Sequence, residues 1–298
     1  AASLMNSSLN IKRLEQTLEN IRSITRVFEH TAARKMDVNR GEIDKLAKYI
    51  QEAQESYSTV KIASTLKSKN RELALSAPLR APKKRKILIL VSSESKYFGN
   101  LINSLVKLFS DEFKQGNADG VVIGEVGKKL LEKEGFKAPN VTYFDFDDDK
   151  PNWEVVSRVN AQLPDYLEVV IFYGQYKSIL TQEIKREDIA KKVVVTSVPE
   201  AKKYDFEPKG NSALALLEKQ IISSNFLQKL YETGLTKNAV AVKILEIGAI
   251  AERINAAMIG LAKFKLRLNK DNNNRKQTQL FSSRAVWARG GIFPVGGE

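Results

Sequence analysis

The sequence predicts an α/β domain inserted between two long helices that pair as an antiparallel coiled coil. Three observations support this fold: coiled-coil spacing of apolar residues near the N-terminus, the same spacing near the C-terminus, and alternating strand and helix patterns between them. The segments we expect are a coiled-coil helix at 1–62, a basic linker at 63–85, an α/β domain at 86–208, a second coiled-coil helix at 209–289 and a Gly-rich tail at 290–298.

The N-terminal helix shows two apolar series with alternating spacings of three and four. The first series is Ile11, Leu14, Leu18, Ile21, Thr25, Phe28 and Ala32. The second series is Ile43, Leu46, Ile50, Ala53, Tyr57 and Val60. The two series are out of phase, which predicts a stutter near residues 35–41. A helix over 9–62 is roughly 80 Å long, so we expect another long helix to bury its seam.

The middle of the chain reads as a Rossmann-like, mostly parallel sheet, because its strand patterns are almost continuously apolar and alternate with helical patterns. Predicted strands cover 86–91, 120–124, 141–146, 167–173 and 192–195. Predicted helices cover 99–115, 126–134 and 151–163. The chain enters and leaves one domain, so the flanking helices can run antiparallel.

The C-terminal helix repeats the coiled-coil spacing. Its predicted seam is Ile247, Ile250, Ile254, Ala257, Leu261, Phe264 and Leu268. Gly234 is a candidate break in this helix, and residues 271–274 are weak helix formers.

Positive charge is concentrated in two segments of this +13 chain. Residues 63–86 and 263–289 each hold eight Lys or Arg and one acidic residue. Such clusters indicate an acidic partner, which could be nucleic acid, lipid headgroups or a protein surface; for 63–86 a solvated loop remains the alternative. The absence of cysteine excludes disulfides and thiolate catalysis, and a single histidine, His30, argues against a histidine-rich metal site. No apolar run is long enough to predict a membrane span.

One segment resembles a phosphate-binding loop at first sight, because Gly124, Gly127 and Lys128 follow a predicted strand. The loop spacing requires glycine where Val122 stands and Ser or Thr where Lys129 stands. The sequence therefore predicts an ordinary strand–helix turn here. We expect no catalytic, cofactor-binding or metal-binding residue in this chain, and no cofactor.

Several motifs occur in an order that a known family shares. They are ITRVF at 24–28, AARK at 32–35, SSESKYFGN at 92–100, YDFEP at 204–208, RINAAM at 253–258 and NNRKQ at 273–277. Together with the order helix, α/β domain, helix, these motifs resemble those of the γ subunit of F-type ATP synthases. The end of the chain, with LFSSRAVW at 280–287 and then a Gly-rich tail, departs from the family pattern.

The resemblance implies a central rotor shaft that couples rotation driven by ion flow to ATP synthesis or hydrolysis in a surrounding α3β3 ring. It implies that the chain is a non-catalytic subunit. The implied partners are the α and β subunits, an ε-type stalk subunit and the membrane c-ring. The implied location is peripheral, on the ATP-facing side of a bacterial plasma membrane or of a mitochondrial inner membrane. The implied contacts with β are Arg26, Phe28, Arg34, Lys35, Arg253, Lys276 and Gln277.

Two other functions are open to a basic chain with this pattern. A coiled-coil nucleic-acid-binding protein agrees with the charge, but residues 63–86 contain no aromatic side chain on which a base could stack. A nucleotide-dependent α/β enzyme would need the phosphate loop that Val122 and Lys129 interrupt. We therefore rank both below the rotor shaft and expect no nucleic-acid partner.

Overall fold

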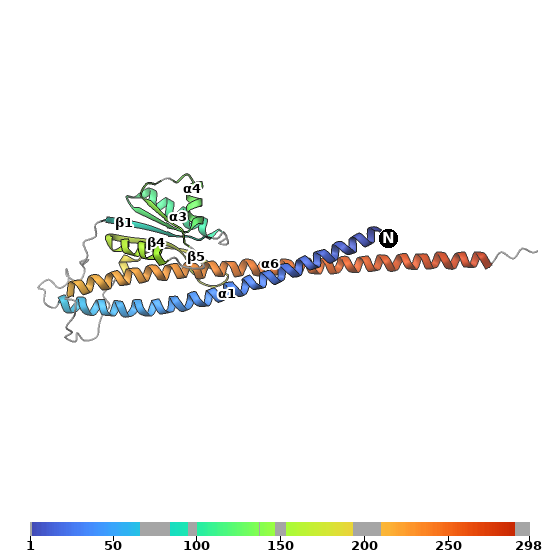
Figure 1. Ribbon diagram of the computed structural model, residues 1–298, viewed down its shortest axis with the longest axis horizontal. Helices are drawn as coiled ribbons and strands as arrows, with labels where there is room; N and C mark the ends of the chain where they lie inside the picture. Colours follow the sequence, from blue (N-terminus) through green and yellow to red (C-terminus); the bar gives the residue numbers. More distant parts are fainter. Residues whose placement is uncertain are drawn as a thin grey trace, which may run out of the picture. The chain divides into compact units, whose positions relative to one another are not determined.

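The computed structural model describes residues 2–65, 84–94, 100–136, 138–146, 153–192 and 210–289. They belong to two compact units. Ala1–Phe28 and Leu245–Glu298 form unit 1, and Glu29–Ile244 forms unit 2. Two long helices, α1 (Ala2–Thr65) and α6 (Gly210–Arg289), contribute to both units (Figure 1). The predicted linker and tail fall largely outside the described residues.

The two long helices pack together in opposite directions within unit 2. Ala32 and Met36 of α1 cluster with Leu235 and Ala239 of α6. Later residues of α1 contact earlier residues of α6, because Ala53, Tyr57 and Val60 cluster with Leu214 and Ile221. This order confirms the predicted antiparallel coiled coil.

The buried positions of α1 follow one heptad register. Buried or half-buried residues recur in steps of three and four, with one step of seven from Leu18 to Thr25, at Ile11, Glu15, Leu18, Thr25, Glu29, Ala32, Met36, Asn39, Ile43, Leu46, Ile50, Ala53, Tyr57 and Val60. The predicted stutter near residues 35–41 is therefore wrong. It arose from assigning Leu14, Ile21 and Phe28 to the seam, whereas all three are exposed.

Helix α6 is continuous over its 80 residues. Gly234 does not break it. A Cβ atom at Gly234 would lie 2.9 Å from Nδ2 of Asn39, so glycine here permits close approach of α1. The weak helix formers at 271–274 also lie inside α6.

A five-stranded sheet in unit 2 has the strand order β3-β2-β1-β4-β5. The first four strands in this order are parallel, and β5 runs antiparallel to β4. The strands are β1 (Lys84–Val91), β2 (Asp119–Ile123), β3 (Val141–Phe144), β4 (Tyr166–Tyr176) and β5 (Gln182–Asp188). The polar sequence of β5 gave no strand signal, and this strand was not predicted. The strand expected at 192–195 lies almost entirely outside the described residues.

Helices cover both faces of the sheet, which gives the predicted Rossmann-like layering (Figure 1). On one face, α3 (Leu101–Gln115) and α4 (Glu125–Lys133) pack on alternate strand residues such as Leu88 and Phe172. On the other face, α5 (Trp153–Gln162) and α6 pack on the intervening residues, such as Ile89 and Ile171. Two 3-10 turns, η1 (Leu163–Asp165) and η2 (Ala190–Lys192), complete the described elements.

Candidate functional site: the outer surface of the coiled coil

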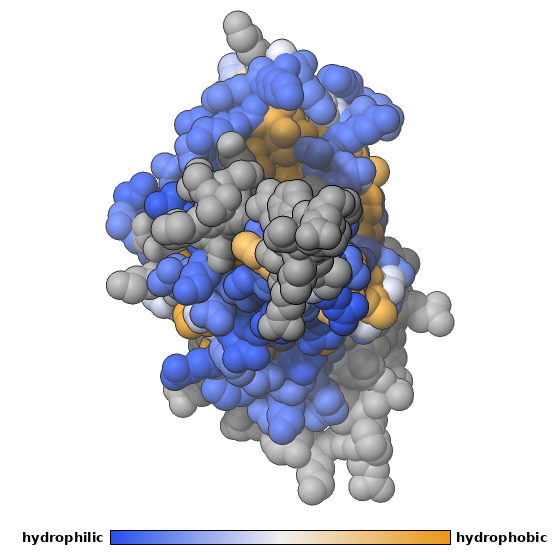
Figure 2. Space-filling view, turned by 90° about the vertical axis from the view of Figure 1, so that its right-hand side faces the viewer, coloured by the Kyte–Doolittle hydropathy of each residue, from blue (hydrophilic) through white to orange (hydrophobic). Residues whose placement is uncertain are grey.

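In unit 1, helix α6 turns its apolar residues outward. The residues are 45% to 69% exposed, and we call them the apolar stripe: Ile247, Ile250, Ile254, Met258, Leu261, Phe264 and Leu268. The sequence had assigned six of these seven residues to the seam, so the predicted seam is wrong. The molecular face drawn in Figure 2 is mostly hydrophilic, and its largest orange patch lies at the top of the view.

The seam of α6 in unit 1 lies two residues out of register with the prediction. Its buried or half-buried residues are Leu245, Ala249, Glu252, Ile259, Lys263 and Leu266. A shift of two residues turns a helix by about 200°. The apolar stripe therefore faces away from α1.

Two ion pairs cross the seam of unit 1. Nε of Arg22 lies 2.9 Å from Oε1 of Glu252, whose side chain is only 9% exposed. Lys263 pairs with Glu15 across the same seam. Because each charge has a partner of opposite sign, the helices can meet here with fewer apolar contacts than an ordinary coiled coil uses.

Helix α1 also exposes apolar side chains in unit 1. Leu14, Ile21, Ile24, Val27 and Phe28 are each 48% to 65% exposed. The seam of unit 1 thus combines two ion pairs with half-buried apolar residues such as Leu18 and Leu266, while further large apolar residues lie outside it. Extensive exposed apolar surface marks a protein–protein contact.

The predicted contact residues occupy exposed positions, with one exception. Arg26 and Phe28 lie on the exposed side of α1, and Arg253 is exposed directly beside Ile254 of the apolar stripe. Lys276 and Gln277 are exposed neighbours on α6. In unit 2, Arg34 is exposed and Lys35 is half-buried on α1.

The glycines that resembled a phosphate loop have packing roles. Gly124 has φ +98°, and a Cβ atom there would lie 2.6 Å from the backbone N of Ser93. A Cβ atom at Gly127 would lie 2.7 Å from Cβ of Ser92. Both glycines let the turn between β2 and α4 approach the end of β1.

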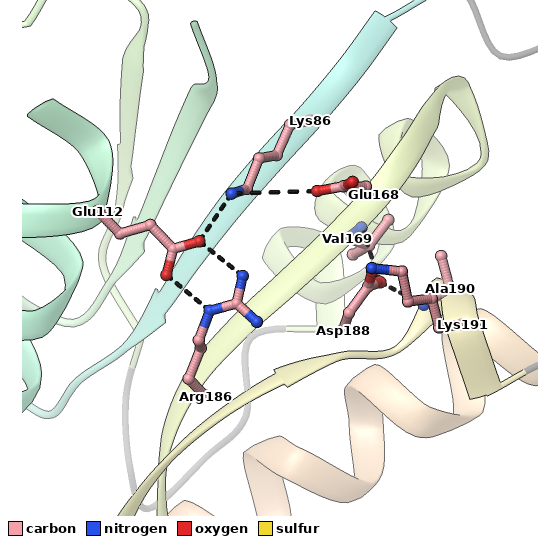
Figure 3. A network of polar contacts seen from close by, with 8 residues as sticks. All are labelled: Lys86, Glu112, Glu168, Val169, Arg186, Asp188, Ala190 and Lys191. Atoms are coloured by element: carbon pink, nitrogen blue, oxygen red, sulfur yellow. Dashed lines mark hydrogen bonds and ion pairs between the residues drawn. The ribbon is translucent and has the colours of Figure 1, made fainter. Parts of the chain in front are cut away.

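The main polar network of the sheet joins α3, β1 and β5 (Figure 3). Glu112 accepts two hydrogen bonds of 2.7 Å from Arg186 and one of 2.7 Å from Lys86. The bonds from Arg186, with Lys86 adding to them, hold the pKa of Glu112 down to about 2. A carboxylate held in its charged form by two cations serves to fix the fold rather than to exchange protons.

Among the residues that the structure describes, no group of three or more His, Cys, Asp or Glu side chains could hold a metal ion. The described helices include none that is both long and apolar enough to cross a membrane.

Sequence reasoning missed the charged seam because it searched for apolar spacing alone. Glu15 and Arg22 on α1, and Glu252 and Lys263 on α6, stand at heptad positions with opposite charges on the two helices. A search for complementary charges at heptad spacing would have found them.

A family model described as ATP synthase matches residues 8–242. The central stalk of the Tetrahymena thermophila mitochondrial ATP synthase has the same fold, with a TM-score of 0.54 and 16% identity, over 76% of this chain and 99% of that chain. Two structures of the Euglena gracilis mitochondrial ATP synthase also match. The first has a TM-score of 0.41 and 12% identity, over 85% of this chain and 98% of that chain. The second has a TM-score of 0.43 and 11% identity, over 91% of this chain and 98% of that chain. The family match gives no support to the nucleic-acid alternative. The chain therefore belongs to the γ family of F-type ATP synthases, the family of the rotor shaft.

Proposed function

We propose that this chain is the non-catalytic central shaft that turns inside an α3β3 ring of an F-type ATP synthase or ATPase. The observation that carries the proposal is the apolar stripe of unit 1, which lies outside a charged seam. A surrounding ring of apolar loops would cover such a stripe. Because the surface of the shaft differs around its circumference, each catalytic subunit would contact a different side and adopt a different state.

Seven residues of the shaft would supply the contacts that change during rotation. Arg26, Arg34 and Lys35 would contact acidic segments of β, Phe28 and Arg253 would also contact β, and Lys276 and Gln277 would make the contacts nearest the end of α6. The exposure of six of these seven side chains supports this assignment. Exposed ion pairs are individually weak, so the contacts can form and break in each turn.

The α/β domain would contact the ε-type stalk subunit and the c-ring, which places the chain at the ATP-facing side of an energy-coupling membrane. ATP chemistry would take place in the ring subunits, with no cofactor bound to this chain. The packing roles of Gly124 and Gly127 support this division of labour, because they account for the glycines without a phosphate.

Co-expression with α and β subunits tests the proposal. The expected result is a complex with one copy of this chain per three αβ pairs, and faster ATP hydrolysis than the ring alone. Elution of the chain by itself, or a ring activity that does not respond to it, would overturn the proposal for those partners.

A further inference from the structure

Four polar contacts join the β4–β5 hairpin to the coiled coil, all within unit 2. Three of them start from Lys229, Thr236 and Lys243 of α6. These residues are seven apart, so they lie on one face of the helix. The fourth contact comes from Arg40 of α1.

The first contact is a buried cation. Nζ of Lys229 lies 3.4 Å from Oε2 of Glu187 on β5 and 2.8 Å from Oε1 of Glu232 on α6, and the lysine side chain is 5% exposed. Nζ also lies 4.7 Å from the ring centroid of Tyr173. Tyr173 donates its hydroxyl hydrogen to Glu187 at 3.0 Å. The hairpin thus holds this ammonium group by a carboxylate and an aromatic face.

The other contacts follow along the hairpin. The fully buried hydroxyl of Thr236 lies 2.9 Å from the carbonyl oxygen of Gly174 and 2.8 Å from the carbonyl oxygen of Glu232 in its own helix, so the two acceptors share its one hydrogen. Nζ of Lys243 donates to the carbonyl oxygen of Leu180 at 3.0 Å. Arg40 donates to the hydroxyl of Tyr176 at 2.9 Å, with its guanidinium 5.3 Å from the ring centroid.

These contacts add direction to the apolar packing beside them. Phe226 and Leu230 pack α6 onto the sheet, and this close packing already opposes sliding. Hydrogen bonds are directional. Rotation of α6 by one residue, about 100°, would take the buried ammonium of Lys229 away from Glu187. The ammonium would keep Glu232 of its own helix but lose Glu187, and a buried charge that loses one of its partners is less stable, so the contacts favour one angle of α6 on the sheet.

We propose that Lys229, Thr236 and Lys243 form a rotational lock that transmits torque between the α/β domain and the coiled coil. The inference rests on the proposed shaft function, in which the α/β domain meets the ion-driven rotor and the coiled coil meets the catalytic ring. A shaft whose two parts slip past each other would hydrolyse ATP without moving ions.

A double cysteine variant can test this contact in two states of the same protein, reduced and oxidised. A Cβ atom at Gly174 would lie 3.4 Å from Cβ of Thr236, close to the separation of about 3.5–4.5 Å found in disulfides. The chain has no cysteine that could compete. In the variant with Gly174→Cys and Thr236→Cys, reduction leaves the hairpin without the threonine hydroxyl, and oxidation joins the two elements covalently.

The measurement is the number of ions moved per ATP by the whole complex in sealed vesicles, against an increasing ion gradient. For the reduced pair and for Thr236→Val we expect near-normal ATP hydrolysis but slip roughly tenfold more frequent under load, since one buried hydrogen bond is lost. Oxidation of the cysteine pair is expected to restore the ion-to-ATP ratio. Thr233→Val is the matched control, because this buried threonine donates to Lys229 O within its own helix.

Normal coupling in Thr236→Val would overturn the lock, as would an equal loss in Thr233→Val. A formed disulfide that leaves the ratio low would also overturn it. If the unmodified chain itself fails to couple hydrolysis to ion movement, the shaft function has failed, which is a separate result from failure of the lock.

Discussion

Nε of Arg22 lies 2.9 Å from Oε1 of Glu252 in the seam of unit 1, where an ordinary coiled coil would place leucine. The apolar residues that could have filled this seam, such as Ile254 and Leu261, lie exposed on the other side of α6. Ion pairs in part of the seam leave the two helices less apolar contact with each other, and the apolar residues outside create a surface for a partner. The same arrangement explains the fold of this segment and its proposed place within a ring.

The Arg22–Glu252 pair is expected to cost stability relative to an apolar seam. Glu252 is nearly buried but the Arg22 side chain is 46% exposed, so replacing both residues by leucine should stabilise unit 1 by about 1 kcal/mol, whereas Glu252→Ala alone should destabilise it by about 1 kcal/mol. Hydrogen exchange of the amides around residue 252 measures the effect locally. Equal protection in the double variant and the single variant would contradict this account.

Glu112 should make the stability of unit 2 depend on pH. Its pKa falls from 4.5 to about 2 in the folded protein. A depressed carboxyl pKa contributes stability above the unfolded value and loses it as the pH falls toward the folded value. Glu112→Gln should therefore reduce the unfolding free energy at pH 7 by up to about 3 kcal/mol, and the difference should shrink between pH 4.5 and 2.

Denaturant titrations at several pH values measure this dependence. Glu154→Gln is the control, because Glu154 pairs with Arg158 on the surface and its side chain is 69% exposed. This control should change stability by less than about 0.5 kcal/mol at any of these pH values. A pH-independent difference for Glu112→Gln would show that the network does not act through its charge.

Gly124 and Gly135 give a matched test of the turn between β2 and α4. Both have positive φ, but a Cβ atom at Gly124 meets the backbone of Ser93 at 2.6 Å, whereas Gly135 has open space around it. Gly135→Ala should cost about 1–2 kcal/mol for its backbone conformation. Gly124→Ala should cost at least about 2 kcal/mol more, because backbone must move. Thermal unfolding compares them, and equal costs would contradict the packing role.

Lys276 tests the proposed contacts near the end of α6. Charge reversal by Lys276→Glu should slow ATP hydrolysis of the assembled complex by about fivefold at low salt, since an exposed ion pair contributes up to about 1 kcal/mol. The effect should shrink at high salt because exposed charges are screened. Lys219→Glu, at another exposed position of α6, is the control and should have little effect. Salt-independent inhibition would argue against an ionic contact.

Much of the fold follows from local patterns in the sequence. Apolar runs gave four parallel strands, and heptad spacing gave both long helices. The sequence could not reveal β5, because Gln182–Asp188 is mostly charged and is held by pairing with β4 rather than by its own apolar residues. The seam of α6 was misassigned for a related reason. Apolar spacing marks one face of a helix, but it does not tell whether that face packs against the other helix of the same chain.

Contacts between residues that are far apart in the chain could not be predicted from the sequence either. Thr236 and Gly174 are 62 residues apart, and nothing in either local pattern indicates that one donates to the other. The predicted contact residues came from a resemblance, and their exposure is compatible with the role assigned to them. Their contacts with β stay a prediction.

Assembly of stripe variants tests the central claim most directly. Ile254→Asp with Leu261→Asp adds two negative charges to the apolar stripe, and Asn255→Asp with Asn269→Asp adds two at exposed polar positions of the same helix. Binding of each variant to the α3β3 ring would be measured by size and by stimulated ATP hydrolysis. We expect the stripe variant to bind at least roughly 100-fold more weakly, since two apolar side chains lose their buried contacts, and the control to bind as the unmodified chain does. Normal binding of the stripe variant would contradict the claim that the ring covers the apolar stripe.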